Sequence, residues 1–522
     1  MNDLKINLLK KNYNRNLIIL SIVIFSSLSL RLFLIPIDVP IKLDGIDYFS
    51  FAFEFSKNGI YPNGILHTND GWSIFLSPFF SIVGSSDFMN LIYTQRIVSI
   101  ILSTMTIIPV YYLCKKFTSS SFSLVGTSIF AFHPRLIENS ILGITESLFI
   151  FLVTLTLFFI FSKNDKLLFF GFITASFSSI VRYEGLMIFI PLSIFFFIKY
   201  RNNKKHYLRY ILFIGIALLI LLPIANLRSQ DYEMDGFMSH LFSGIQIISC
   251  TFQCDFEDPE VSEDPNYIQT KNLYSNSLIS TVKYLIWVSI PFFLILTPIG
   301  VYQFFKSRNN NLLYLLLFGF FLLIPASYAY GREIQEIRYL FVLFPILSIF
   351  SANAFNFNKK FLKNNWFLFL IPVFFIFSIF YFSLYQDDYV FQKEIYFVTK
   401  YIVDEADGVN IYNGNGYVKV ATLENNWPNP LTLNEKGRTI YDVNKIPYDN
   451  SKTLEEFLIN SKNKNLTHLV ILENNKNSFL DDLFKNYKNY QYLTKTFDSA
   501  DFEFENRILV FKINYNLFET IS

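Results

Sequence analysis

Cysteine and charge are what this sequence has least of. Its 522 residues include only Cys114, Cys250 and Cys254, too few for a disulfide scaffold or a cysteine-based zinc site. Charged residues make up 16% of the chain, against about 25% in soluble globular proteins. The net charge of +2 gives no reason to expect nucleic acid as a partner. These shortages exclude an ordinary soluble protein of several domains.

Long apolar blocks fill most of the first 385 residues. The chain is 52% hydrophobic, and a membrane-spanning helix needs roughly 20 mostly apolar residues. Eleven segments are candidate spans: 17–37, 91–113, 121–137, 144–162, 166–181, 186–199, 209–227, 281–304, 311–330, 338–356 and 364–385. The first follows a basic N-terminus and is too long for a signal-peptide core, so we interpret it as an uncleaved spanning helix. The sequence predicts a polytopic α-helical membrane protein.

The distribution of charge between the candidate spans predicts their orientation. Alternate loops are basic, with Lys115 and Lys116, Lys163 and Lys166, Lys199 to Arg209, Lys306 and Arg308, and Lys359 to Lys363. The opposite loops are acidic, and residues 231–264 carry nine acids with no Lys or Arg. Because cytoplasmic loops are enriched in Lys and Arg, we expect the N-terminus inside and the C-terminus outside the cell membrane.

This topology divides the chain into three parts. They are a cytoplasmic tail at 1–16, a transmembrane domain at 17–385 with external loops 38–90 and 228–280, and an extracytoplasmic α/β domain at 386–522. In loop 38–90 the stretches 47–59 and 71–84 are predicted to be helices along the membrane surface. In the last part we expect strands in 408–414, 466–474 and 507–515, and helices in 453–461 and 479–487.

Ionisable residues gather at the predicted outer ends of the spans. They are Arg31, Asp44, Asp47, Arg96, His133, Arg135, Glu138, Glu146, Arg182, Glu184, Arg332, Glu333, Glu336 and Arg338. Charges at membrane depth are costly and tend to mark functional cavities. Arginine suits a phosphate group, whereas carboxylates suit a general base or a divalent metal. Taken singly, any of these charges also fits a helix-end anchor, and Arg182 and Glu184 could simply pair with each other.

Several stretches resemble one superfamily of membrane enzymes. The first feature is an Asp after the first helix, followed by a Tyr and by surface helices. Three further stretches are "AFHPRLIENSILGITESLFIFL", "SSIVRYEGLMIFIPL" and "REIQEIRYLFVLFPILS". Together they resemble the GT-C superfamily of polyprenyl-phosphate-sugar glycosyltransferases. The chain is similar in particular to the branch of protein O-mannosyltransferases and the lipid A aminoarabinose transferase, including archaeal members with an extracytoplasmic C-terminal domain.

The resemblance implies a role for the acids. Asp44 matches the acid that opens the first external loop and acts as catalytic base or metal ligand. The superfamily often has a second acid directly after it, where this chain has Gly45, so Asp47 is an alternative base. Glu146 matches an acid that faces the same cavity. If a metal binds, Asp44 and Glu146 are its expected ligands.

The resemblance also implies a site for the sugar donor. Arg182 and Glu184 match an "R-x-E-G" motif, and Arg338 with Tyr339 matches an "RY" pair that would hold the lipid phosphate. From their place at the outer face, Arg96 is a further candidate for binding the donor, and Glu138 is a further acid of the cavity.

The implied reaction is the transfer of a sugar, with inversion, from a polyprenyl-phosphate donor to a hydroxyl of a protein, glycan or lipid. The sequence indicates no certain cofactor, although a divalent cation could do part of the work. The Trp-Trp-Asp triplet of oligosaccharyltransferases does not occur, which favours transfer of a single sugar. A membrane transporter or flippase is the alternative, as is a purely structural or receptor role. Two features stay open: a disulfide between Cys250 and Cys254, and glycosylation at Asn465.

Overall fold

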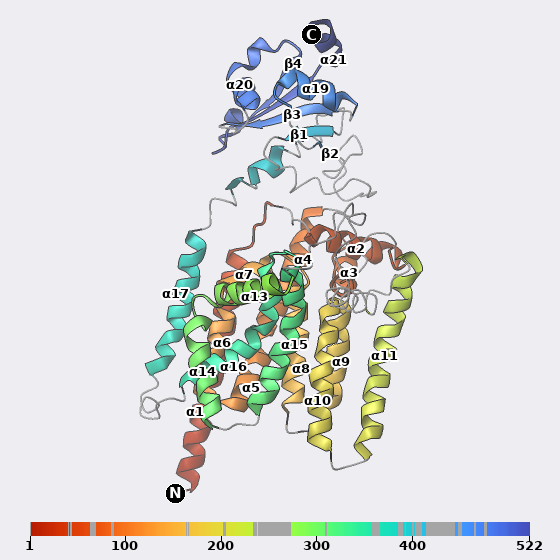
Figure 1. The fold of residues 1–522 in the computed structure, drawn as a ribbon. Helices are drawn as coiled ribbons and strands as arrows, with labels where there is room; N and C mark the ends of the chain where they lie inside the picture. The colour runs from red at the N-terminus through yellow and green to blue at the C-terminus, as the bar shows by residue number, and fades with distance from the viewer. Residues whose placement is uncertain are drawn as a thin grey trace. The chain divides into compact units, whose positions relative to one another are not determined.

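The chain forms two compact units (Figure 1). The first comprises Met1–Ile35, Tyr48–Ser81 and Gln95–Tyr381, and the second comprises Pro36–Asp47, Ile82–Thr94 and Phe382–Ser522. The computed structural model describes residues 2–39, 41, 44–62, 69–84, 88–162, 164, 166–201, 205–232, 237, 273–307, 311–355, 366–384, 390–391, 393–398, 401, 410–413, 444–446, 451–463, 466–473 and 478–521.

The described residues between 2 and 383 are mostly helical. The helices are α1 (Asn2–Phe33), α2 (Asp44–Asn58), α3 (Gly71–Val83), α4 (Phe88–Met105), α5 (Ile107–Phe117), α6 (Ser120–Ala131), α7 (Pro134–Ile141), α8 (Glu146–Ile160), α9 (Leu167–Val181), η1 (Tyr183–Ile188), α10 (Phe189–Tyr200), α11 (Lys205–Tyr232), α13 (Leu273–Ser289), α14 (Phe293–Ser307), α15 (Asn311–Gly331), η4 (Ile337–Leu343), α16 (Phe344–Ala354), η7 (Trp366–Phe369) and α17 (Leu370–Ser383). The two surface helices expected in 47–59 and 71–84 are present as α2 and α3, and their place along a membrane surface stays a prediction.

Six helical segments in the described part of the chain are long and apolar enough to cross a membrane, or seven if one bent pair counts as a span. Four of the eleven predicted spans are instead shorter apolar helices of 12 to 15 residues, α6, α8, α9 and α17. The prediction of a polytopic α-helical membrane protein is confirmed, and each of the eleven apolar segments contains a helix.

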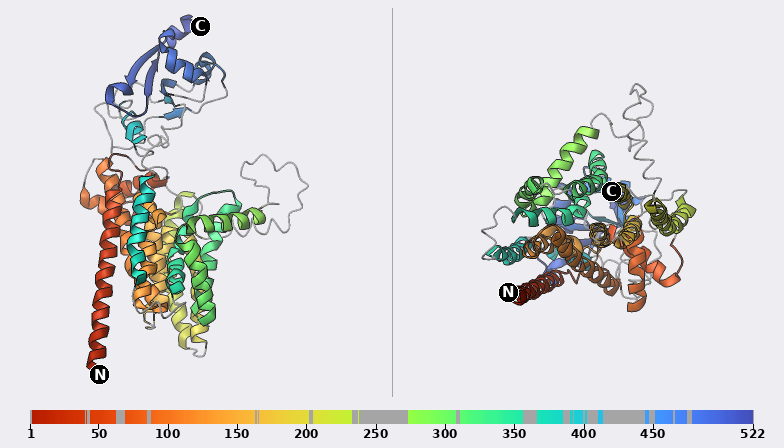
Figure 2. Two further views of the ribbon diagram at one scale, coloured as in Figure 1. Left: turned by 90° about the vertical axis from the view of Figure 1, so that its left-hand side faces the viewer. Right: turned by 90° about the horizontal axis from the view of Figure 1, so that it is seen from below.

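The predicted span 281–304 is not one straight helix. The segments Asn276–Ser289 and Phe293–Ser307 are bent against each other by 104°, so this part of the chain is a broken span or a re-entrant pair (Figure 2). Pro291 lies in the break, and proline has no N–H with which to continue a helical hydrogen-bond ladder. Hydropathy alone did not reveal the break because apolar residues continue through it.

Two glycines let the helices of the first unit approach α16 closely. A Cβ at Gly300 of α14 would lie 1.7 Å from the carbonyl oxygen of Phe350, and one at Gly126 of α6 would lie 2.5 Å from the carbonyl oxygen of Ser348. The Asn353 side chain also donates a hydrogen bond of 2.9 Å to the carbonyl of Gly300. Small residues at such crossings are typical of membrane helices, whose backbones must approach to gain packing contacts.

We therefore expect Gly300→Ala to destabilise the protein, because the added methyl meets a backbone oxygen that cannot rotate away. Overpacking of this kind costs about 1–3 kcal/mol. The measurement is the thermal unfolding midpoint in detergent. Gly215→Ala in α11 is the matched control, since a Cβ there meets nothing within 4 Å. Equal midpoints for the two variants would contradict the close packing of α14 on α16.

Among the described residues of the C-terminal part of the second unit, five strands form a mixed sheet. Its strands are β1 (Asn410–Asn413), β2 (Asn444–Ile446), β3 (Leu466–Leu472), β4 (Leu493–Asp498) and β5 (Ile508–Ile513). Their order is β2-β1-β3-β5-β4, with β1 parallel to β2 and β3, and β5 antiparallel to β3 and β4. The expected strands and helices are present, together with two unpredicted strands, β2 and β4. The C-terminal sheet domain of the predicted fold class is thereby confirmed.

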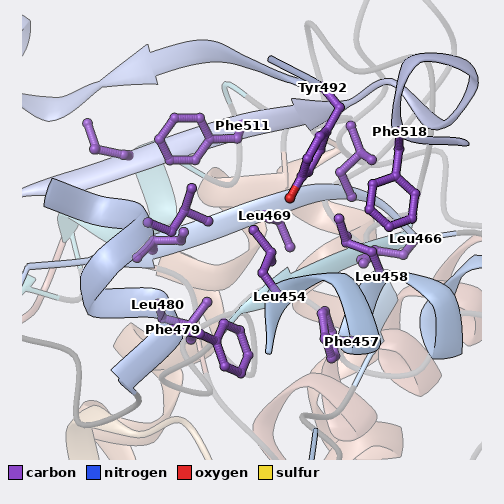
Figure 3. Packing of buried hydrophobic residues seen from close by; sticks show 14 residues of the cluster. Leu454, Phe457, Leu458, Leu466, Leu469, Phe479, Leu480, Tyr492, Phe511 and Phe518 are labelled. Carbon is purple, nitrogen blue, oxygen red and sulfur yellow. The ribbon is translucent and has the colours of Figure 1, made fainter. Parts of the chain in front are cut away.

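Helices α19 (Leu454–Lys462) and α20 (Ser478–Asn486) supply six of the fourteen residues in this domain's buried hydrophobic cluster. Figure 3 shows Leu454, Phe457 and Leu458 of α19 and Phe479 and Leu480 of α20 gathered with side chains of the strands. Leu469 and Ile471 of β3 alternate with residues of the other face, as do Leu509, Phe511 and Ile513 of β5. This two-residue period is what the alternation of a β-strand requires.

Some predicted features lie outside the described residues. They are most of the acidic stretch 231–264, the pair Cys250 and Cys254, and the acceptor residue Asn465. The predicted boundaries of the three parts of the chain, and their orientation in the membrane, likewise stay predictions.

Candidate functional site

Arg182 stands at the turn where α9 ends and η1 begins. Its backbone is extended, its N–H donates to the carbonyl of Ser178 at 2.9 Å, and its carbonyl accepts from the N–H of Gly185 at 2.9 Å. Gly185 must lack a side chain, because a Cβ there would lie 2.6 Å from the backbone nitrogen of Ser179. The "R-x-E-G" sequence thus makes a tight turn that folds back onto the last turn of α9.

The Arg182 guanidinium joins two carboxylates. Its Nη1 lies 2.6 Å from Oε1 of Glu146, and its Nη2 lies 2.7 Å from Oε1 of Glu184. Its Nε donates to Oε2 of Glu184 at 3.3 Å, and Nη1 also donates to Oγ1 of Thr145 at 3.2 Å. All three charged side chains are at least nine-tenths buried. We call Arg182, Glu146 and Glu184 the charge triad.

The triad keeps its central cation charged. Burial by itself lowers the pKa of Arg182, but the nearby Glu184 and Glu146 carboxylates outweigh this effect and hold its pKa well above the ordinary value. The guanidinium also lies over the ring of Tyr339, at 5.3 Å from its centroid. Arg182 thus keeps its positive charge despite its burial.

Glu146 owes its place to the start of α8. It is the first residue of that helix, where the exposed backbone N–H groups favour a negative charge. The turn before it is held by two donors to the carbonyl of Gly143, Trp72 Nε1 at 2.9 Å and Gln95 Nε2 at 2.7 Å. Two residues outside the triad thus fix the backbone that carries the Glu146 carboxylate.

Arg338 of η4 is the more accessible of the two arginines. Its side chain is 20% exposed, and its Nη1 lies 4.0 Å from the same Glu146 Oε1. Its Nε is 3.1 Å from Oε2 of Glu336, whose side chain is 48% exposed. An incoming anion can therefore compete with Glu336 for Arg338 at little cost, whereas at Arg182 it would have to displace a buried carboxylate.

The triad, Arg338 and Tyr339 line one small cavity of about 20 Å³, room for about one water molecule. Its apolar wall is formed by Phe149, Ile150, Leu322, Pro325, Ala326 and Val342. α8, which begins with Glu146, and α9, which ends just before Arg182, run side by side in the bundle (Figure 1). The polar side chains of α8, the α9–η1 turn and η4 thus converge beside an apolar helix surface.

A second, larger cavity lies against the other side of α8. Its volume is about 820 Å³, and its walls come from α3, α4, α8, α9 and α11. Leu148, Phe151 and Leu152 face it, whereas Phe149 and Ile150 face the small cavity. All of its lining residues are apolar, apart from Gly71 at its edge. A space of this size and character suits an aliphatic chain.

The predicted site residues fall into two groups. The structure brings together Glu146, Arg182, Glu184, Arg338 and Tyr339, all five of which line the small cavity. Among the described lining residues of that cavity, neither Arg96 nor Glu138 occurs. Arg96 is buried on α4, directly after Gln95, and Glu138 is exposed on α7.

Asp44 and Asp47 lie in the first turn of α2, and both are half-buried. They fall in the segment Pro36–Asp47, which belongs to the second compact unit. Their spacing of three residues puts both carboxylates on one side of the helix start. Their role as base or metal ligand stays a prediction, and the described residues contain no cluster of three or more His, Cys, Asp or Glu that could hold a metal.

Sequence reasoning missed one buried ion pair, Asp70 with Arg228. The signal was present: Arg228 directly follows the apolar segment 209–227, and Asp70 directly precedes the apolar start of α3. Nothing in the sequence joins them, because they are 158 positions apart.

Comparison with solved structures identifies the fold. The oligosaccharyltransferase of Archaeoglobus fulgidus in complex with zinc and sulfate superposes with a TM-score of 0.55 and 13% identity, over 87% of this chain and 67% of that one. ArnT from Cupriavidus metallidurans bound to undecaprenyl phosphate superposes with a TM-score of 0.56 and 10% identity, over 95% and 97% of the two chains. The fold is GT-C-like.

A third structure with the GT-C-like fold is AglB from A. fulgidus in complex with an inhibitory peptide and a dolichol-phosphate, with a TM-score of 0.51 and 11% identity over 88% of this chain and 69% of that one. The sequence itself matches no protein-family model and no curated protein. The similarity to the GT-C superfamily found in the sequence motifs is thus confirmed at the level of the fold.

We expect substitutions of Arg182 and Arg338 to differ sharply in their effect on stability. Arg182→Gln removes the cation that directly contacts two buried carboxylates, which costs about 3–5 kcal/mol. Arg338→Gln removes a partly exposed ion pair worth no more than about 1 kcal/mol. Unfolding midpoints of both variants in detergent measure the difference. If Arg182→Gln lowers the unfolding midpoint no more than Arg338→Gln does, the charge triad is not what holds the α9–η1 turn.

Proposed function

We propose that this protein transfers a sugar from a polyprenyl-phosphate donor to a hydroxyl group of a protein, glycan or lipid at the outer face of the membrane. The observation that carries the proposal is the pairing of a partly exposed Arg338 with the buried charge triad in a GT-C-like fold. It offers a cation for a phosphate group beside an apolar helix surface.

Two further observations support a lipid donor. The apolar cavity of about 820 Å³ has the character that an isoprenoid chain requires. Two proteins of the same fold were solved with such lipids, ArnT with undecaprenyl phosphate and AglB with a dolichol-phosphate. The charge distribution of the loops supports the orientation, with the N-terminus in the cytoplasm and the C-terminal domain outside.

In the proposed reaction the acceptor oxygen attacks the anomeric carbon from the side opposite the phosphate. The new carbon–oxygen bond forms as the bond to the phosphate oxygen breaks, and the configuration inverts. The carboxylate of Asp44, or that of Asp47, takes the proton of the acceptor hydroxyl. The bonding electrons leave with the lipid phosphate, and Arg338 neutralises the charge that grows there.

Arg182 has a different part in this proposal. Two carboxylates already neutralise it, so it is better suited to hold Glu146 in place than to bind the phosphate. Glu146 in turn lies 4.0 Å from Arg338 and restrains its guanidinium. Glu184 and Tyr339 complete the wall of the small cavity around this arrangement.

The first test is sugar transfer in proteoliposomes with a panel of radiolabelled polyprenyl-phosphate sugars. We expect Asp44→Asn to abolish transfer, since removing the base costs about 100- to 10,000-fold in rate. Asp47→Asn is the matched comparison one helical turn away. Loss with Asp47→Asn alone would make that residue the base, and full activity of both variants would refute the role of either acid.

If well-folded wild-type protein consumes no sugar donor at all, the proposed function is wrong, and transport of a polar or lipid-linked substrate becomes the better hypothesis. Retention of folding is checked by the unfolding midpoint of each variant in the same detergent.

A second test addresses the phosphate. Arg338→Gln should lower kcat/KM for the sugar donor by about 10- to 100-fold, because a charge-assisted hydrogen bond to phosphate is lost. Arg332→Gln is the matched control, since Arg332 lies six residues away, is half-buried and is not among the residues that line the small cavity. Equal losses in the two variants would indicate a general effect of surface charge in place of phosphate binding at Arg338.

A further inference from the structure

Asp70 and Arg228 form an ion pair that the proposed reaction does not use. Arg228 Nη2 lies 2.5 Å from Oδ1 of Asp70, and its Nε lies 3.2 Å from Oδ2. The two side chains are 0% and 1% exposed. The hydroxyl of Tyr61 donates a further hydrogen bond to Asp70, and the ring of Phe237 lies 4.3 Å from the guanidinium.

The ion pair also contacts the C-terminal end of α9 through a hydrogen bond of Arg228. Arg228 Nη2 also donates to the carbonyl oxygen of Ile180 at 3.2 Å. Ile180 is two residues before Arg182, so Arg228 fixes the last turn of the helix that leads into the charge triad. Arg228 itself lies near the end of α11, the helix at one edge of the bundle (Figure 1).

Asn69 and Gly71, the two neighbours of Asp70 in the sequence, contact the residues on either side of Arg182. The side-chain oxygen of Asn69 accepts from the backbone N–H of Tyr183 at 3.2 Å. A Cβ at Gly71 would lie 2.6 Å from the backbone nitrogen of Val181, so these two backbones are in direct contact. Asn69 has a left-handed backbone, with φ of 63°, that turns its side chain toward Tyr183.

These contacts lie on both sides of Arg182 in the sequence. We call Asn69, Asp70, Gly71 and Arg228 the clasp. Arg228, Gly71 and Asn69 contact residues 180, 181 and 183, and Asp70 holds Arg228. Burying an ion pair gains little net stability, because desolvation offsets most of the attraction. Its benefit is better sought in geometry, because the clasp contacts the backbone on both sides of Arg182, whose guanidinium must meet Glu146, Glu184 and Thr145 at once.

We propose that Asp70 and Arg228 are positioning residues that hold the α9–η1 turn, and through Arg182 and Glu146 set the place of Arg338 in the site. The purpose assigned to the turn rests on the proposed function, whereas the clasp itself does not. Neither residue touches the sugar donor or the acceptor in this proposal.

The clasp is tested first without reference to activity, by hydrogen exchange of the full-length protein in detergent. Asp70→Asn and Arg228→Lys should speed exchange of the amides of residues 178–185 about tenfold or more, since charge-assisted hydrogen bonds are lost. Exchange in α16 should not change. Ser229→Ala is the matched control, because its exposed hydroxyl bonds only to the carbonyl of Asn226 among the described contacts.

A milder variant guards against misfolding. Asn69→Gly keeps the left-handed backbone available and removes only the acceptor for the N–H of Tyr183. It should speed exchange at residues 182–185 alone. Exchange that rises equally throughout the protein, or that does not rise in any of these variants, overturns the clasp.

Kinetics then test what the clasp is for. Asp70→Asn should lower kcat/KM for the polyprenyl-phosphate sugar by about 10- to 100-fold, as expected for a displaced site group. In an Arg338→Gln background the same change should add little, because both act through one contact with the lipid phosphate. Fully additive losses would show that the clasp does not act through Arg338 and overturn the positioning role. A wild-type protein that transfers no sugar but shows the local exchange effect would refute the proposed function and leave the clasp intact.

Discussion

The buried contact of Arg182 with Glu146 and Glu184 is the interaction on which the rest of the site depends. It joins the start of α8 to the turn between α9 and η1, two places that are 36 residues apart in the chain. A charge buried to this extent is tolerable only when it is fully paired, so the backbone on both sides must be held accurately. The Gly185 turn, the donors to Gly143 and the contacts of Asn69 and Gly71 all serve that requirement.

Arg182 and Arg338 differ in their surroundings, although the sequence alone does not reveal that difference. Arg182 is satisfied by protein carboxylates and keeps its charge through them. Arg338 lies 4.0 Å from the same Glu146 oxygen and 3.1 Å from the exposed Glu336, so a ligand could replace Glu336 beside it. Burial and the number of acceptors, and not residue type, thus separate the two arginines, and we assign phosphate binding to the more accessible one only as part of the proposed function.

Much of this could be read from the sequence, and the rest could not for physical reasons. Apolar block length indicated the helices, and the "R-x-E-G" and "RY" motifs led to Arg182, Glu184, Arg338 and Tyr339, which do line one cavity. The break after Ser289 was missed because hydropathy measures how apolar a segment is and not whether its helix axis changes direction. The Asp70–Arg228 pair was missed because its partners are 158 positions apart, and only the folded bundle brings them together.

The contacts that fix this bundle are of the kind that a bilayer favours. Lipid tails are as apolar as leucine, so burying leucine between helices gains little, and packing contacts and polar pairs must position the helices instead. Here Gly126 and Gly300 bring backbones onto α16, and Arg228 joins α11 to the end of α9. A soluble enzyme could hold a catalytic turn with a hydrophobic core. In this protein a few polar contacts hold the α9–η1 turn, and we therefore expect a substitution of Arg228, near the end of α11, to reach the charge triad.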